Sequence, residues 1–160
     1  MRTNEEPIVH TVVLPASSFE VWQALTEVSH LRVWLFDTIL TFRPEVDFET
    51  SFAVSTGERD FEHLWRVEEV ALYQRLAIGW RYGGFPGDSL VLFELDDDPD
   101  GTRLTLTHTV REDFPADVPE FERESGAEGW RLLLDQRLPA MFDEPADSPD
   151  DGLTDWLQYD

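Results

Sequence analysis

The amino-acid sequence predicts an α+β domain in which a curved antiparallel sheet packs around a long helix near the C-terminus. Three patterns support this fold class. The β-branched run Ile8–Leu14 leads directly into a segment with helical spacing. Between Phe48 and Val110, apolar and polar residues alternate as they do in half-buried strands. Beyond Glu120 the apolar residues return to the spacing of one helix face.

The first strand and the helices that follow it have recognisable boundaries. Ile8–Leu14 is predicted to be a strand that Pro15 closes. Ser17 and Glu20 have the S-x-x-E spacing of a capping box, which predicts the start of a helix. Behind them, apolar residues recur at helical intervals: Val21, Trp22, Leu25 and Val28. A second short helix is predicted with Ser29 as its N-cap and with Leu31, Trp34 and Leu35 on its buried side.

The middle of the chain predicts a meander of antiparallel strands. Counting the first strand, we expect about six or seven strands in one curved sheet. Their central segments are Phe48–Val54, His63–Val70, Leu76–Tyr82, Ser89–Leu95 and Thr102–Val110. Glycine-rich and aspartate-rich turns separate them, as expected of short hairpin connections.

A final helix of roughly 20 residues is predicted from about Glu120. Its apolar stripe comprises Phe121, Trp130, Leu133, Leu134, Leu138 and Met141. Pro139 is expected to kink or end it. Gly126 and Gly129 each cost roughly 1 kcal/mol in a helix interior, so they call for a reason such as close approach of the helix backbone to a neighbouring group or a portal. A fraying first turn of the helix is the alternative explanation.

Composition excludes several classes of function. The 160 residues fit one domain and include no cysteine, so a disulfide framework and a thiolate metal site are both excluded. The formal net charge is −22, and all 12 basic residues are arginine, so nucleic-acid and membrane-surface binding are disfavoured. We find neither an apolar leader nor a membrane-spanning run, and we expect a cytoplasmic protein. An acidic solvated surface and adaptation to a salt-rich (halophilic) cytoplasm both fit this charge.

The chain divides into a domain over residues 8–142 and an acidic tail over residues 143–160. The tail carries seven acids and no base, and its first half is expected to be disordered. Leu153, Trp156, Leu157 and Tyr159 form an apolar exception within it. Docking of these four residues on the domain or on a partner and simple fraying are both open.

Four segments resemble the START-like (SRPBCC) superfamily, in the branch related to the C-terminal domain of the heat-shock chaperone ATPase activator. They are Leu14–Thr26 (LPASSFEVWQALT), His30–Trp34 (HLRVW), Gly101–His108 (GTRLTLTH) and Glu128–Trp130 with Leu134. The resemblance runs from about Ile8 to Phe142 and implies a helix-grip fold, with a cavity between sheet and helix that holds apolar molecules in relatives. It implies no reaction. The family usually has paired glycines where this chain has Pro44–Asp47, so the turn there is expected to differ.

The predicted ligand-binding residues are apolar and aromatic. Phe52, Trp65, Trp80 and Phe93 are expected on the inward face of the sheet, together with His108, Trp130 and Leu134. A pocket lined by these side chains and a core simply filled by them both fit the sequence.

Several polar residues are also candidates for a functional site, and for each a purely structural role fits the sequence as well. His108 lies on the apolar face of its strand, where it is either a satisfied core histidine or an acid/base group. Arg81, Glu62 and His63 are possible rim residues. Asp96, Asp98, Asp100 and Gly101 match half of a calcium loop, but Thr107 stands where the last ligand should be glutamate. We therefore predict no catalytic residue, no cofactor and no metal.

Three functions follow. The first is non-catalytic binding of a small apolar or aromatic molecule between sheet and helix. The second, suggested by the branch resemblance alone, is a chaperone-associated module that contacts a chaperone ATPase. The third is a cyclase or lyase type of enzyme that uses His108 as acid/base and Arg81 as anchor.

Overall fold

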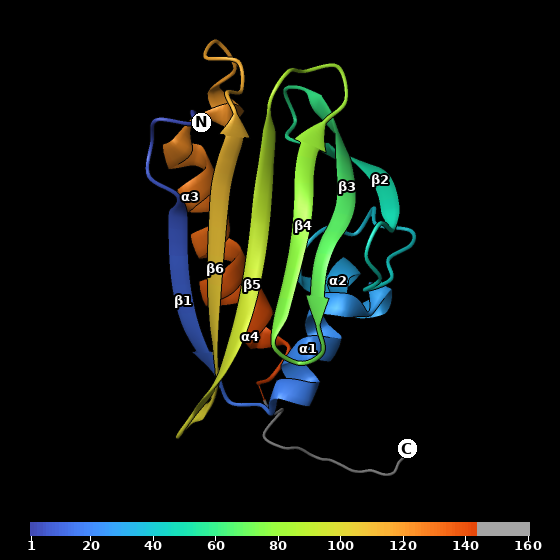
Figure 1. Ribbon diagram of the computed structural model, residues 1–160, viewed down its shortest axis with the longest axis vertical. Helices are drawn as coiled ribbons and strands as arrows, with labels where there is room; N and C mark the ends of the chain where they lie inside the picture. The colour runs from blue at the N-terminus through green and yellow to red at the C-terminus, as the bar shows by residue number, and fades with distance from the viewer. Residues whose placement is uncertain (144–160) are drawn as a thin grey trace.

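The computed structural model describes residues 1–143, in which one antiparallel sheet faces the viewer with the C-terminal helix behind it (Figure 1). The strands are β1 (Ile8–Leu14), β2 (Glu49–Ser55), β3 (Asp60–Ala71), β4 (Arg75–Tyr82), β5 (Asp88–Asp98) and β6 (Gly101–Glu112). They form a six-stranded sheet in the order β1-β6-β5-β4-β3-β2. The predicted α+β class and the antiparallel meander are therefore confirmed.

The two helices after β1 are α1 (Ser18–Thr26) and α2 (Val28–Trp34). The predicted capping box is present: Glu20 N donates to Ser17 Oγ, and Ser17 N donates to Glu20 Oε1. The N-cap predicted for α2 is wrong, because Glu27 and not Ser29 precedes the helix. Glu27 is extended and ends α1, yet its carbonyl already accepts from Leu31 N at 2.9 Å, so the new turn starts two residues early. The burial predicted for Leu31, Trp34 and Leu35 is confirmed.

The final helix is continuous from Arg123 to Ala140 and has three parts: α3 (Arg123–Leu132), the π-helical η2 (Leu133–Arg137) and α4 (Leu138–Ala140). It starts later than predicted, because a separate 3-10 turn, η1 (Pro119–Phe121), and the extended Glu122 precede it. The helix ends at Ala140, one residue after Pro139 and close to the expected end. Pro139 lacks an N–H and crowds the carbonyl four residues back, and the turn before it widens so that Leu138 N bonds to Leu133 O.

The core lies between the inner face of the sheet and this helix. Trp130, Leu134 and Leu138, one turn apart, are each at most 5% exposed. Gly126 allows close packing, because a Cβ there would lie 3.1 Å from Ile8 Cδ1. No atom of another described element lies within 4 Å of a Cβ built at Gly129, so the predicted close approach holds for Gly126 only.

Within residues 1–143, no helix has both the length and the apolar character of a membrane span. The apolar group Leu153, Trp156, Leu157 and Tyr159 and nearly all of the predicted acidic tail lie outside the described residues.

Candidate functional site

The seven residues predicted to bind a ligand all lie in the interior between sheet and helix. Phe52, Trp65, Trp80, Phe93 and His108 come from five different positions on β2 to β6, and Trp130 and Leu134 come from the final helix. Each side chain is at most 6% exposed. The strand alternation and the helical stripe therefore placed each of them on the correct side.

The aromatic rings of this interior contact one another and form a continuous cluster. Ring centroids of Phe52 and Trp65 lie 4.8 Å apart, those of Trp65 and Trp80 5.0 Å, and those of Trp80 and Trp130 5.6 Å. Phe36, Phe42 and His63 extend the contacts. We call these nine residues the aromatic cluster: Phe36, Phe42, Phe52, His63, Trp65, Trp80, Phe93, His108 and Trp130. Of the two alternatives left by the sequence, these contacts match a filled core.

Two rings of the aromatic cluster come from an irregular stretch that the sequence did not identify. Residues 35–48, between α2 and β2, form neither helix nor strand, and we call them the covering segment. The ring centroid of Phe36 lies 5.6 Å from that of Phe52 and 5.0 Å from that of His63. The ring centroid of Phe42 lies 5.9 Å from that of Trp65. Beyond Leu35 the apolar residues of this segment follow no regular period, so no sequence pattern indicated which of them point inward.

The covering segment is fixed at its ends and held by side chains in between. At one end Trp34 is fully buried and its Nε1 donates to Ala24 O at 2.7 Å. At the other end Asp47 N donates to Val67 O, and Val67 N donates to Phe48 O. Within the described residues, no backbone hydrogen bond joins residues 37–44 to the sheet or to a helix. Ile39 and Phe42, at most 7% exposed, anchor that middle part instead.

Asp47 lies in the Pro44–Asp47 stretch, whose turn the resemblance led us to expect to differ from that of the family. It takes a left-handed conformation with φ of 75°, which aspartate tolerates better than most residues do. Its carboxylate pairs with Arg66. Asp47 therefore adopts, without being glycine, a backbone conformation that favours glycine.

One buried donor of the aromatic cluster has no acceptor. Trp65 is 3% exposed, and its Nε1 has no hydrogen-bond partner among the described residues. The other two indoles of the aromatic cluster are satisfied: Trp80 Nε1 donates to Tyr82 Oη at 3.0 Å, and Trp130 Nε1 donates to His108 Nδ1 at 3.1 Å. An unpaired buried donor costs roughly 1–3 kcal/mol, so Trp65 is an exception that calls for an explanation.

His108 is a structural histidine in this arrangement. Ser89 Oγ donates to Trp80 O at 2.7 Å and so accepts from His108 Nε2 at 2.9 Å. With Nδ1 accepting from Trp130, both ring nitrogens are used and the Nε2–H tautomer is fixed. Burial lowers the pKa of His108 to about 4, and burial likewise lowers the pKa of His63 to about 4. Both imidazoles are neutral at pH 7.

The polar rim residues do not converge on the aromatic cluster. His63 lies inside it, 5% exposed and stacked on Phe52. Glu62 and Arg81 each neighbour an inward residue in their strands, so their side chains lie on the opposite, helix-free face. His108 and Arg81 are therefore on opposite sides of the sheet, and the acid/base-and-anchor pairing expected for an enzyme is wrong.

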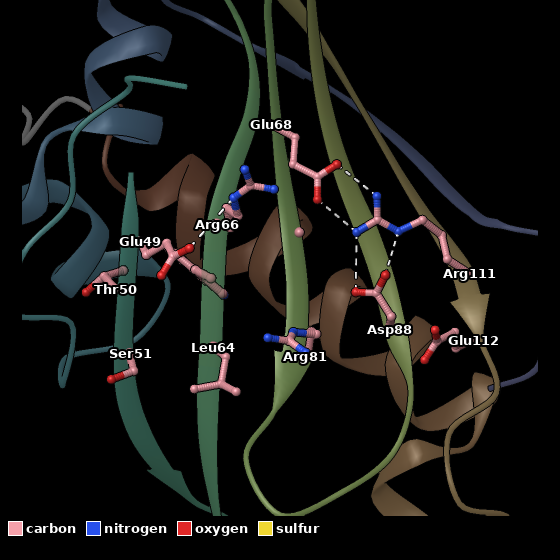
Figure 2. Close-up of a pocket in the computed structure, with 12 residues that line it drawn as sticks. Glu49, Thr50, Ser51, Leu64, Arg66, Glu68, Arg81, Asp88, Arg111 and Glu112 are labelled. Carbon is pink, nitrogen blue, oxygen red and sulfur yellow. Dashed lines mark hydrogen bonds and ion pairs between the residues drawn. The ribbon is translucent and has the colours of Figure 1, made fainter. Parts of the chain in front are cut away.

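The helix-free face carries a polar groove of about 560 Å³ (Figure 2). Arg111 binds both carboxylate oxygens of Glu68, at 2.8 and 2.9 Å, and also Asp88 at 2.9 Å. Gly79 leaves room for this group, because a Cβ there would lie 2.5 Å from Glu68 Oε2. Arg111 thus bridges two carboxylates, and the groove presents an internal ion-pair network.

The half calcium loop is a hairpin turn. Asp98 Oδ1 accepts from Asp100 N at 3.0 Å, and Asp98 Oδ2 pairs with Arg103 at 2.7 Å. Gly101 takes φ of 139° in a tight approach to Leu14 O. Among residues 1–143, no three His, Asp or Glu side chains are grouped to hold a metal ion.

Comparison with solved structures supports the helix-grip fold. Protein Mll3558 from Rhizobium loti superposes with a TM-score of 0.72 at 25% identity, over 84% of this chain and 94% of that one. Protein CV1439 from Chromobacterium violaceum superposes with a TM-score of 0.69 at 20% identity, over 86% of this chain and 96% of that one. CalU16 from Micromonospora echinospora superposes with a TM-score of 0.57 at 26% identity, over 88% of this chain and 77% of that one. No curated protein matches the sequence.

Residues 15–143 match the family described as Activator of Hsp90 ATPase homolog 1-like protein. That match spans α1, α2, five strands of the sheet and the whole final helix. It agrees with the resemblance carried by the four sequence segments and with the superposed structures. This chain therefore belongs to the family of Activator of Hsp90 ATPase homolog 1-like proteins, within the START-like (SRPBCC) superfamily.

Proposed function

We propose that this protein binds a small apolar or aromatic molecule in the aromatic cluster, beneath the covering segment, and does not transform it. One observation carries the proposal. Phe36 and Phe42 close the cluster. Phe42 lies in residues 37–44, which have no backbone hydrogen bond to the sheet or helices among the described residues, whereas Phe36 lies just before them and its N–H donates to Leu31 O of α2 at 3.2 Å. Such a stretch opens at lower free energy than the sheet beneath it.

A ligand would take the place of rings that already fill the space. If Phe36 and Phe42 swing out with the covering segment, the walls left behind are Phe52, Trp65 and Trp80. A guest of about two or three rings restores the apolar contacts that the two phenylalanines lose, which offsets most of the cost of opening. Affinity then depends on how often the open form is populated.

The pair considered for catalysis, His108 and Arg81, gives no support for chemistry on the guest. Both nitrogens of His108 are engaged inside the protein. Arg81 lies across the sheet, in the groove of the opposite face. A general base needs a free nitrogen within hydrogen-bond reach of the guest, and neither residue supplies one.

The family match favours a second candidate function, contact with a chaperone ATPase. Purified chain added to an Hsp90-class chaperone would then raise its ATP turnover, measured by phosphate release. Unchanged turnover at saturating chain would remove this candidate. A cytoplasmic location is compatible with either function and stays a prediction.

A reversible lock on the covering segment tests the first function. Thr41 Oγ1 of the segment and Thr50 Oγ1 of β2 lie 3.2 Å apart, and the chain has no cysteine of its own. The double variant Thr41→Cys with Thr50→Cys can therefore form one disulfide that holds the segment closed. Binding of 1-aminoanthracene is followed by its fluorescence and by the quenching of tryptophan emission.

The reduced double variant should bind one probe per chain, and the oxidised form should bind it at least about tenfold more weakly or far more slowly. Reduction of the same sample should restore binding, which makes it its own control. Equal binding in both states would place the probe elsewhere. Absence of saturable binding to the wild-type chain would overturn the proposed function.

A further inference from the structure

We propose that the molecule bound in the aromatic cluster carries an uncharged hydrogen-bond acceptor, such as a ketone or ether oxygen, which pairs with Trp65 Nε1–H. This inference rests on the proposed function and specifies the chemical class of its ligand. An aromatic ketone of two or three rings is the simplest molecule that meets the description.

The evidence is a contrast between Trp65 and three other indoles of similar burial. Trp34, Trp80 and Trp130 are at most 5% exposed, and each Nε1 donates to a protein acceptor at 2.7 to 3.1 Å. Trp65 is equally buried and has none within the described residues. Buried donors are nearly always paired, so the missing acceptor points to a partner that arrives from outside the chain.

The neighbours of Trp65 explain why the protein does not supply that acceptor itself. Its ring is enclosed by Phe42 at 5.9 Å, Phe52 at 4.8 Å and Trp80 at 5.0 Å. The first two are hydrocarbons, and the third carries a donor that already serves Tyr82. Because Phe42 belongs to the covering segment, its displacement brings a guest directly against the Trp65 ring.

The ligand is uncharged because the aromatic cluster has no charge to balance one. Its nine members include no arginine and no acid, and its two histidines are buried and neutral. A carboxylate or phosphate would also have to enter against a net charge of −22. Burying an unpaired ion costs far more than a single indole hydrogen bond returns.

A matched pair of probes isolates the acceptor. 9-Fluorenone and fluorene share one three-ring skeleton and differ in a carbonyl against a methylene group. Dissociation constants of both are measured by equilibrium dialysis on the full chain, on Trp65→Phe, and on Trp22→Phe as the control variant. Trp22 is also buried but contacts Tyr73, outside the aromatic cluster. Only ratios between the two probes are compared, so any change in pocket size cancels.

In the wild-type chain and in Trp22→Phe, the preference for 9-fluorenone over fluorene should exceed that of Trp65→Phe by about tenfold, the value of one buried hydrogen bond. In ¹⁵N-tryptophan-labelled wild-type chain, 9-fluorenone should shift one indole N–H resonance downfield and fluorene should not. This second measurement needs no variant.

The outcomes separate the two proposals. Binding of both probes with the same ratio in wild type and Trp65→Phe, or with no indole shift, would refute the acceptor and leave the proposed function standing. Binding of neither probe to the wild-type chain would refute both.

Discussion

Replacing Phe42 by alanine should loosen the covering segment without loosening the sheet. Phe42 is 7% exposed and is the ring of the segment that lies against Trp65. Burying a phenylalanine side chain is worth roughly 1.5–3 kcal/mol, and Phe42 forfeits nearly all of it when the segment opens. Phe42→Ala therefore shifts the opening equilibrium toward the open form by roughly 10- to 150-fold.

Indole hydrogen exchange provides the assay. Trp65 Nε1–H is buried and its ring packs against Phe42, so we expect its exchange to require opening of the segment, whereas Trp34 Nε1–H is bonded to Ala24 O beyond the end of the segment. In Phe42→Ala the Trp65 indole should exchange roughly 10- to 150-fold faster while Trp34 is unchanged. The affinity for 1-aminoanthracene should rise with the population of the open form, up to the same factor.

Phe19→Ala is the matched control, because Phe19 is 51% exposed on α1 and should change neither quantity. A parallel rise in the exchange rates of the Trp65 and Trp34 indoles would mean that the segment opens only with the whole domain. An unchanged rate at Trp65 would mean that Phe42 does not hold the segment closed. Either result would refute the reasoning.

Three further predictions concern stability. Burial lowers the pKa of His63 and His108 to about 4, so the unfolded chain binds protons that the folded chain does not. In urea titrations, the free energy of unfolding should therefore be fully retained above pH 6.5 and should fall as the pH drops toward 4, by up to roughly 2.7 kcal/mol per pH unit. The variant His108→Gln should halve that slope. An unchanged slope would show that His108 is not responsible. With a net charge of −22, the melting temperature should climb substantially between 0.1 and 2 M KCl, and a flat or falling curve would contradict salt adaptation. Gly129→Ala should stabilise the chain by about 1 kcal/mol in the same urea assay, because nothing from another described element obstructs the new methyl group. The methyl group of Gly126→Ala meets Ile8, so this variant should gain less stability. Equal gains in stability would show that Gly126 is not needed for packing.

Much of the fold follows from the sequence because its signals are local. The capping box needs only Ser17 and Glu20 three residues apart, and the side of the sheet that Trp65 or Leu104 occupies follows from alternation along one strand. The stripe of Trp130, Leu134 and Leu138 follows from helical spacing in the same way. The predicted start of α2 was wrong because it depends on where the preceding helix stops: Glu27 ends α1 and also serves as the N-cap of α2.

The sequence by itself determined the fold class, the two faces of each strand and the membership of the interior. Only the tertiary structure decided which donors in that interior find acceptors, that His108 is fully satisfied and that Trp65 is not. It also decided that Phe36 and Phe42 close the space from an irregular segment. The physical reason is distance. Periodicity fixes the direction of a side chain within its own element, whereas a hydrogen bond or a ring contact depends on how elements far apart in the chain are placed.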